Sequence, residues 1–94
     1  MITWNEKKRR QVIKDHGVDF KKIGDVFDDP FAIYSEDYDH GHSEKRWLII
    51  ARSAEYGLVA VSYTFRNGDT RLITARRAEK WMRRLYEQQK NRIG

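Results

Sequence analysis

The chain has 94 residues, enough for one hydrophobic core, and we expect a single domain over residues 1–94. Hydrophobic residues make up 39% and charged residues 35%, which predicts a small core under a heavily charged surface. No apolar run is long enough to span a bilayer and no secretion signal is present, so we expect a soluble, cytoplasmic protein. The absence of Cys excludes disulfides and thiolate chemistry, and three His are too few to indicate a structural zinc site.

Charge is distributed unevenly along the chain, although the net charge is only +5. Residues 1–24 carry seven basic and three acidic side chains, whereas residues 25–44 carry seven acidic side chains and no Lys or Arg. Residues 45–94 carry twelve basic and four acidic side chains. Clustered Lys and Arg favour a polyanionic partner such as nucleic acid, although a solvated charged surface has the same composition.

The first third of the sequence predicts a short edge strand and two helices. Residues 2–4 are an apolar segment, and Asn5 is a suitable N-cap for a helix that ends near His16, before Gly17. Asp19 is a suitable N-cap for a second helix, whose apolar residues recur at helical spacing: Phe20, Ile23, Val26 and Phe27. Pro30 ends this segment. We expect a strand near residues 31–34 and a polar acidic loop over residues 35–43.

Three segments rich in β-branched and aromatic residues predict consecutive strands at 46–53, 58–66 and 70–76. Asn67-Gly68 favours a two-residue type I′ hairpin between the last two. The register that this turn implies pairs Thr64 with Arg71, Ser62 with Ile73, and Ala60 with Ala75. One face of the hairpin would then be polar, and the other would pack on helices through Val59, Val61, Tyr63, Phe65 and Leu72.

A last helix is predicted over residues 77–90. Its apolar stripe consists of Ala78, Trp81, Met82, Leu85 and Tyr86, and we expect Trp81 in the core. The opposite side is cationic. The predicted architecture is therefore α+β, with two N-terminal helices, a mainly antiparallel sheet and a C-terminal helix.

The polar hairpin face is a candidate phosphate site. Arg66 and Arg71 would offer paired guanidinium donors, and the hydroxyl groups of Ser62 and Thr64 would add neutral donors. A solvated polar surface is the open alternative. Arg76 and Arg77 lie at the predicted start of the last helix, where cations oppose the helix dipole, and this placement favours a functional role in binding a ribose-phosphate.

Histidine is the default proton carrier near neutral pH. His16 fits that role, but a protonated His also stabilises the carboxyl end of a helix, so both roles stay open. His40 and His42 lie in the acidic loop, where a weak metal site is an alternative without a specific ligand pattern. The sequence contains no glycine-rich phosphate loop and no Ser nucleophile elbow.

Five blocks in order resemble the BrnT family of bacterial toxins, small ribonucleases with a RelE-like fold. The blocks are Ile2-Thr3-Trp4-Asn5-Glu6-Lys7-Lys8, His16-Gly17-Val18-Asp19-Phe20, Val26-Phe27-Asp28-Asp29-Pro30, Glu44-Lys45-Arg46-Trp47 and Arg71-Leu72-Ile73-Thr74-Ala75-Arg76-Arg77-Ala78. Two positions depart from the family's pattern: Asn5 stands where the family often has Asp, and Met82 where it often has Glu.

The resemblance implies a toxin of a type II toxin-antitoxin system that cleaves RNA. It also implies a ribbon-helix-helix antitoxin as inhibitor, in a complex that binds its own promoter DNA. We therefore expect a metal-independent endoribonuclease in which the ribose 2′-hydroxyl attacks the adjacent phosphorus, with no cofactor.

The residues expected to act in this reaction are Arg46, Arg71, Arg76, His16 and Lys8. The three arginines would hold the phosphate, His16 or a loop His would transfer a proton, and Lys8 would add positive potential; Tyr86 is a further candidate. The expected RNA-binding residues are Arg52, Arg66, Arg77, Arg83 and Arg84. The alternative is a non-catalytic module that binds nucleic acid or a protein through the same basic face.

Overall fold

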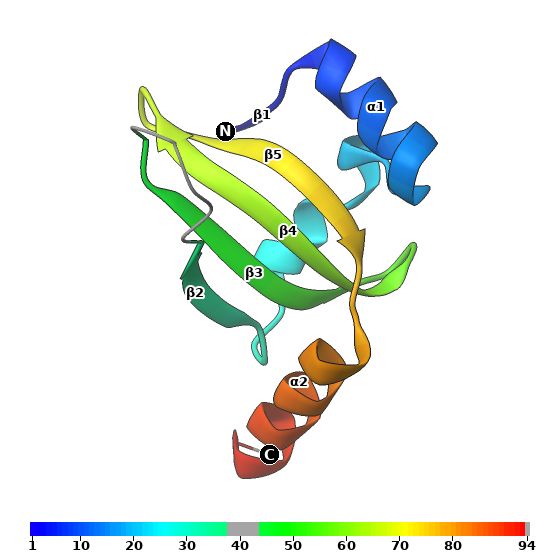
Figure 1. Cartoon of the computed structure of the whole chain (residues 1–94). Coiled ribbons are helices and arrows are strands. Elements are labelled where there is room, and N and C mark those ends of the chain that lie inside the picture. Colours follow the sequence, from blue (N-terminus) through cyan, green and yellow to red (C-terminus); the bar gives the residue numbers. More distant parts are fainter. Residues whose placement is uncertain (38–43, 94) are drawn as a thin grey trace.

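The computed structural model describes residues 1–37 and 44–93, which form an α+β fold around one five-stranded sheet (Figure 1). The strand order is β1-β5-β4-β3-β2; β1 runs parallel to β5 and the other neighbours are antiparallel. The strands are β1 (Ile2–Thr3), β2 (Ile33–Asp37), β3 (Arg46–Ser53), β4 (Gly57–Arg66) and β5 (Asp69–Arg77). The helices are α1 (Glu6–His16) and α2 (Lys80–Ile93). The predicted α+β class and mainly antiparallel sheet are thus confirmed.

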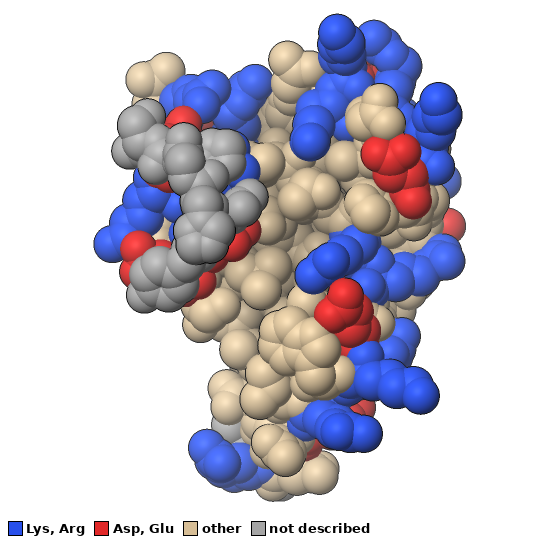
Figure 2. Space-filling view, in the orientation of Figure 1, with Lys and Arg blue, Asp and Glu red and all other residues tan. Residues whose placement is uncertain are grey.

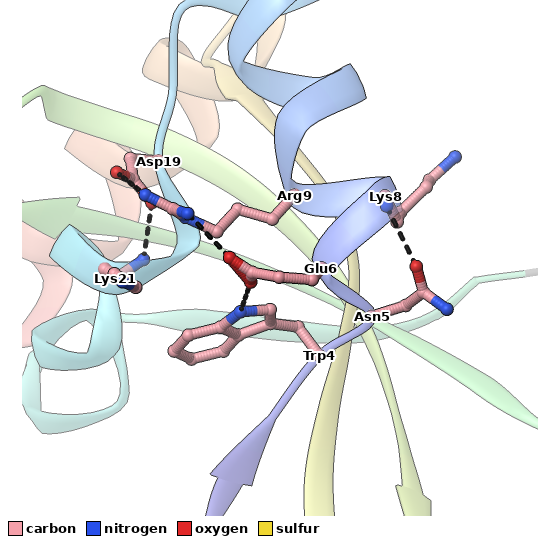
Figure 3. A network of polar contacts seen from close by, with 7 residues as sticks. All are labelled: Trp4, Asn5, Glu6, Lys8, Arg9, Asp19 and Lys21. Carbon is pink, nitrogen blue, oxygen red and sulfur yellow. Dashed lines mark hydrogen bonds and ion pairs between the residues drawn. The ribbon is translucent and has the colours of Figure 1, made fainter.

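Helix α1 begins and ends at the predicted residues. The Asn5 side chain accepts a hydrogen bond from the Lys8 backbone N–H, and Gly17 ends the helix with a φ of 67°, a conformation that favours glycine. Arg9 donates to Glu6 within the helix and to both carboxylate oxygens of Asp19, and the Asp19 contact connects α1 to the segment that follows it (Figure 3). The Lys8 side chain extends away from this network.

The second N-terminal helix was predicted wrongly. Asp19 does act as an N-cap, but the segment forms two short 3₁₀ helices, η1 (Phe20–Lys22) and η2 (Gly24–Asp28), with Ile23 between them. Phe20, Ile23 and Val26 are nevertheless buried, as the apolar spacing required. The spacing of apolar residues every three or four positions fits 3₁₀ and α-helices alike, which explains the difference.

The β4–β5 turn confirms the Asn-Gly prediction, because Asn67 and Gly68 have φ of 54° and 82°. Thr64 pairs with Arg71 as predicted. A β-bulge between Ser62 and Tyr63 then shifts the register, so that Ser62 pairs with Thr74 and Ala60 with Arg76, not with Ile73 and Ala75. The bulge therefore brings Thr74 and Arg76 to the face that carries Ser62.

The two faces of the sheet are covered differently. On one face, Val59, Val61 and Tyr63 pack with residues of α1, η1 and η2 in the main core. On the other face, α2 covers one end of the sheet through Met82 and Tyr86, which contact a cluster with Ile50, Leu58 and Ala60. No helix of residues 1–37 or 44–93 lies over the rest of this second face, and we call it the open face (Figure 1).

Three apolar side chains predicted to pack in the interior are exposed: Phe65, Trp81 and Leu85, the last of which is 41% exposed. Phe65 is 60% exposed, because it lies near the end of β4, although its ring contacts that of Tyr63 edge to face. Trp81 is 50% exposed, since only the Met82–Tyr86 side of the predicted α2 stripe reaches the sheet. Helix α2 also begins later than predicted, so that Arg76 and Arg77 belong to β5 and the helix-dipole argument does not apply to them.

Candidate nucleic-acid site on the open face

Helix α1 runs along the outer edge of β5. Lys8 near the start of α1 lines a pocket with Arg71, and His16 at its end lines a pocket with Arg76, so α1 and β5 run the same way along the sheet. Lys8 and His16 lie eight residues apart, about 12 Å along the helix. Arg71 and Arg76 lie about 16 Å apart along β5 at the usual rise of a strand. Helix α1 and strand β5 thus each contribute one side chain, Lys8 and Arg71, to a first level of the open face. They contribute His16 and Arg76 to a second level further along both elements.

The first level is a cationic pocket of about 550 Å³, which we call the arginine pocket. Its charged lining residues are Lys8, Glu44, Arg46, Arg66 and Arg71, and Asn5, Leu72 and Ile73 complete it. Arg46 and Arg71 are half-buried, and Lys8 is exposed at the rim. Four cations and one carboxylate give the pocket an excess positive charge that suits a phosphodiester.

Glu44 neutralises one of these cations. Arg66 donates to both Glu44 carboxylate oxygens, with a shortest distance of 2.6 Å. These hydrogen bonds hold the pKa of Glu44 below its usual range. Glu44 therefore offsets one of the four positive charges, and the arginine pocket keeps a net positive charge.

The second level is a pocket of about 400 Å³, which we call the His16 pocket. It is lined by His16, Asp37, Leu48, Ala60, Ser62, Thr74 and Arg76. Ala60 and Ser62 are 3% and 7% exposed, so its floor is part of the sheet itself. The Ser62 hydroxyl donates to an Asp37 carboxylate oxygen at 2.9 Å. Arg76 also lies 3.6 Å from a carboxylate oxygen of Glu79.

Both pockets open on the same face of the sheet. Ala60, Ser62 and Thr64 share one side of β4, because side chains alternate along a strand. Their register partners in β5 are Arg76, Thr74 and Arg71, respectively. Figure 2 shows this face, with Lys and Arg side chains gathered around a central area that carries little charge. The structure thus brings the expected residues Lys8, Arg46 and Arg71 together in one pocket and His16 and Arg76 together in the next.

The remaining sequence-predicted arginines lie elsewhere. Arg77 pairs with Val59 on the opposite face, with its guanidinium 5.6 Å from the Tyr56 ring centre. Arg52 lines a third cavity, of about 570 Å³, beside η2 and α2, and its guanidinium lies 5.6 Å from the Tyr86 ring centre. Arg83 and Arg84 are exposed on α2.

Two predicted site residues have structural partners. Thr64 is 2% exposed and donates to the Lys45 carbonyl at 2.6 Å, so it is not the phosphate ligand that the sequence suggested. Tyr86 is 2% exposed and donates to Asp29 at 2.8 Å. Burial and this hydrogen bond raise the pKa of the Tyr86 hydroxyl.

Asp37, Glu44 and Thr74 were missed as site residues. Asp37 and Glu44 fell in or beside a predicted acidic loop, and Thr74 reaches the site only because of the bulge. His40 and His42 lie outside the described residues. Within residues 1–37 and 44–93, no three His, Asp or Glu side chains are grouped to hold a metal ion, and no helix is long and apolar enough to cross a membrane.

Comparison with known proteins gives a family match over most of the chain. Residues 4–81 match the family described as the ribonuclease toxin, BrnT, of a type II toxin-antitoxin system. The fold is similar to the crystal structure of the Brucella abortus ribonuclease toxin BrnT, with a TM-score of 0.64 and 22% sequence identity over 84% of this chain and 96% of that one. A search of curated proteins found no match.

Proposed function

The chain belongs to the BrnT family of ribonuclease toxins, and we propose that it cleaves RNA bound along the open face, without a metal ion or other cofactor. The observation that carries this proposal is that two pockets lie one after the other along α1 and β5. One contains Lys8, Arg46 and Arg71, and the next contains His16 and Arg76. A single strand lying along β5 would meet a cation at each level.

The reacting phosphodiester belongs at the His16 pocket, since a proton carrier must lie within hydrogen-bond reach of the reacting atoms. The ribose 2′-hydroxyl attacks phosphorus, the bond to the 5′-oxygen breaks, and the products are a 2′,3′-cyclic phosphate and a 5′-hydroxyl. Arg76 stabilises the charge that develops on the phosphate oxygens. His16 either takes the proton from the 2′-hydroxyl or gives a proton to the departing 5′-oxygen, and water carries out the other proton transfer. The arginine pocket holds the neighbouring phosphodiester of the RNA.

A matched pair of arginines tests this proposal. Arg76 and Arg77 are adjacent in β5 but lie on opposite faces. Purified protein is incubated with a long RNA in the presence of a chelator, and cleavage is followed on a gel. We expect Arg76→Gln to slow cleavage by about a hundredfold or more, as for loss of a donor to a developing charge, and Arg77→Gln to leave the rate nearly unchanged. Intact RNA at excess wild-type protein would reject the enzymatic function.

The same assay separates catalysis from binding alone. One carboxylate of the arginine pocket, that of Glu44, pairs with the protein's own Arg66, which fits the alternative of a shielded binding face. If Arg71→Gln and Arg76→Gln both weakened RNA affinity and the wild-type protein cleaved no RNA, the protein would be a non-catalytic binding module.

We propose further that a ribbon-helix-helix antitoxin inhibits this protein in the cytoplasm, that the complex binds its promoter DNA, and that the fold is RelE-like. Family membership supports the first two statements, because type II toxins are paired with a protein antitoxin. Expression of the chain alone should arrest bacterial growth, and co-expression of the small neighbouring reading frame should relieve the arrest. Arrest that the neighbour does not relieve would argue against that partner.

A further inference from the structure

We propose that Trp81 is a stacking platform for a nucleobase of the bound RNA, beside the phosphodiester held at Arg76. This inference rests on the proposed function, because the base belongs to the strand bound along the open face. It goes beyond that function because it assigns a contact for a base, whereas the two pockets were assigned only to the sugar-phosphate backbone.

Helix α2 leaves two large apolar side chains on its surface. Trp81 is 50% exposed, and Leu85, about one turn further along, is 41% exposed. Neither belongs to the cluster that joins α2 to the sheet, where Met82 and Tyr86 are buried. Figure 2 shows an uncharged surface over α2 that continues from the central uncharged area of the open face. Exposed aromatic rings next to a charged site are typical of contact surfaces.

Glu79 connects Trp81 to the His16 pocket. The Trp81 indole Nε1–H donates to one Glu79 carboxylate oxygen at 2.6 Å, and Arg76 Nη1 lies 3.6 Å from the other oxygen. A single carboxylate group therefore separates the indole from the guanidinium. This one ion pair leaves other N–H donors of Arg76 for a phosphate, because a guanidinium carries several.

The structure of a nucleotide fits this spacing. A base is joined to its phosphate through one ribose, so a nucleotide whose phosphate contacts Arg76 can place its base against Trp81. The backbone of the strand stays on β5, and only this base turns towards the first turn of α2. The platform therefore serves one of the two bases that flank the reacting phosphodiester.

The hydrogen bond to Glu79 also determines how the indole can bind a base. Its N–H is already used, so the ring offers its π face and not a donor. Stacking on such a face is available to every base. We therefore expect a contact that does not read hydrogen-bond patterns, with a modest preference for purines, whose larger rings overlap the indole more. Because Glu79 holds the indole in place, less side-chain freedom is lost on binding, and Glu79 is a positioning residue.

Two non-cleavable ligands test the contact without requiring cleavage. A 2′-O-methyl adenosine hexanucleotide and a hexamer of the same backbone without bases are titrated into the full chain, and the ratio of their affinities is measured. We expect Trp81→Leu to lower this ratio by about tenfold, a typical effect for loss of one stacked base. Trp81→Phe is the matched control, which keeps an aromatic face and should keep most of the ratio. Loss of folding or of phosphate contacts would weaken both ligands alike and leave the ratio unchanged.

Tryptophan fluorescence gives a second measurement. The adenosine hexamer should quench the emission of the wild-type protein, and the hexamer without bases should not. Trp4 and Trp47 pack against the main core on the other face, so this quenching should be absent from Trp81→Leu.

A pair of Glu79 variants tests the positioning role. Glu79→Ala releases the indole and should lower the affinity ratio. Glu79→Gln keeps an acceptor for Nε1–H and should retain the ratio. Both variants remove the ion pair with Arg76, so their difference reports on the indole alone. An equal ratio in the two variants would overturn the role of Glu79.

The outcomes for the two proposals are separate. An unchanged ratio in Trp81→Leu, or no quenching by the adenosine hexamer, would overturn the stacking contact and leave the ribonuclease function standing; the exposed indole would then point to a protein partner. A ratio that falls in Trp81→Leu, in a protein that leaves long RNA intact, would overturn the ribonuclease function and leave the stacking contact standing. A fall in the ratio together with cleavage by the wild type would support both.

Discussion

The ion pair between Arg9 and Asp19 fixes the position of α1, and therefore of Lys8 and His16. Arg9 Nε lies 2.7 Å from one Asp19 oxygen, and its Nη2 lies 2.9 Å from the other, a bidentate arrangement (Figure 3). Asp19 also accepts from the Lys21 backbone N–H and caps η1. The hydrogen bonds from Arg9, with that from Lys21, lower the pKa of Asp19 from 3.8 to about 2.

We expect Asp19→Asn to lower the free energy of unfolding at neutral pH by roughly 1–2 kcal/mol, because Asn keeps the cap but loses the ion pair. The folded-state pKa lies below the unfolded value, so this contribution is complete above about pH 4 and is lost as the pH falls towards 2. Urea denaturation across that range should show a steeper loss for the wild type than for the variant.

Asp15→Asn is the control for this measurement. Asp15 is an exposed carboxylate on the same helix and accepts a hydrogen bond from Gln11 at 2.9 Å. Its substitution removes one charge without removing the Arg9 contact, so the wild-type pH dependence between 4 and 2 should persist. Equal pH dependence in the wild type and Asp19→Asn would mean that the ion pair does not stabilise the fold.

At the scale of elements, α2 is held to the sheet through few contacts. Met82 and Tyr86 are buried against the sheet, and the Tyr86 hydroxyl donates to Asp29. Asp29 also accepts from the backbone N–H groups of Phe31 and Arg52. Burial opposes ionisation of Asp29, but these three hydrogen bonds outweigh it and lower its pKa. One carboxylate thus joins α2, β3 and the segment before β2.

Tyr86→Phe distinguishes this structural role from the catalytic role that the sequence left open. We expect a loss of about 1–2 kcal/mol in the free energy of unfolding, because one buried hydrogen bond is removed while the ring and the other Asp29 donors remain. The cleavage rate per folded molecule should be unchanged, since Tyr86 lies at the third cavity and not at the His16 pocket. A large loss of rate in a fully folded variant would instead indicate a role in the reaction.

The elements that the sequence predicted well are those determined locally. Alternating β-branched residues and the Asn67-Gly68 turn predicted β3, β4 and β5 to within about one residue, and Asn5 and Gly17 predicted the ends of α1. The bulge at Ser62 has no local sequence pattern, and it decides which β5 residues enter the site. The division of the candidate residues between two pockets depends on the parallel β1–β5 pairing, which is a tertiary property.

At the scale of the whole molecule, several carboxylates of the acidic segment, residues 25–44, bond to other groups of the protein. Asp25 accepts from the Ala54 backbone N–H, Asp29 joins α2 to the sheet, and Glu44 pairs with Arg66. These carboxylates satisfy backbone donors or single cations. The residues that line the two pockets of the open face include five cations and two carboxylates, Asp37 and Glu44, and so give this face a net charge of +3 with His16 neutral.

The salt dependence of RNA binding measures how many of these cations contact phosphates. For a non-cleavable 2′-O-methyl hexanucleotide, four contacts predict a slope of about −3 in a plot of log affinity against log salt concentration. Arg71→Gln should reduce the magnitude of the slope by about 0.7. Arg84→Gln removes an equal charge from the exposed side of α2 and should leave it unchanged, because Arg84 lines neither pocket of the open face. Equal changes in both variants would place the strand on α2 as well, and no change in either would remove the open face as the binding site.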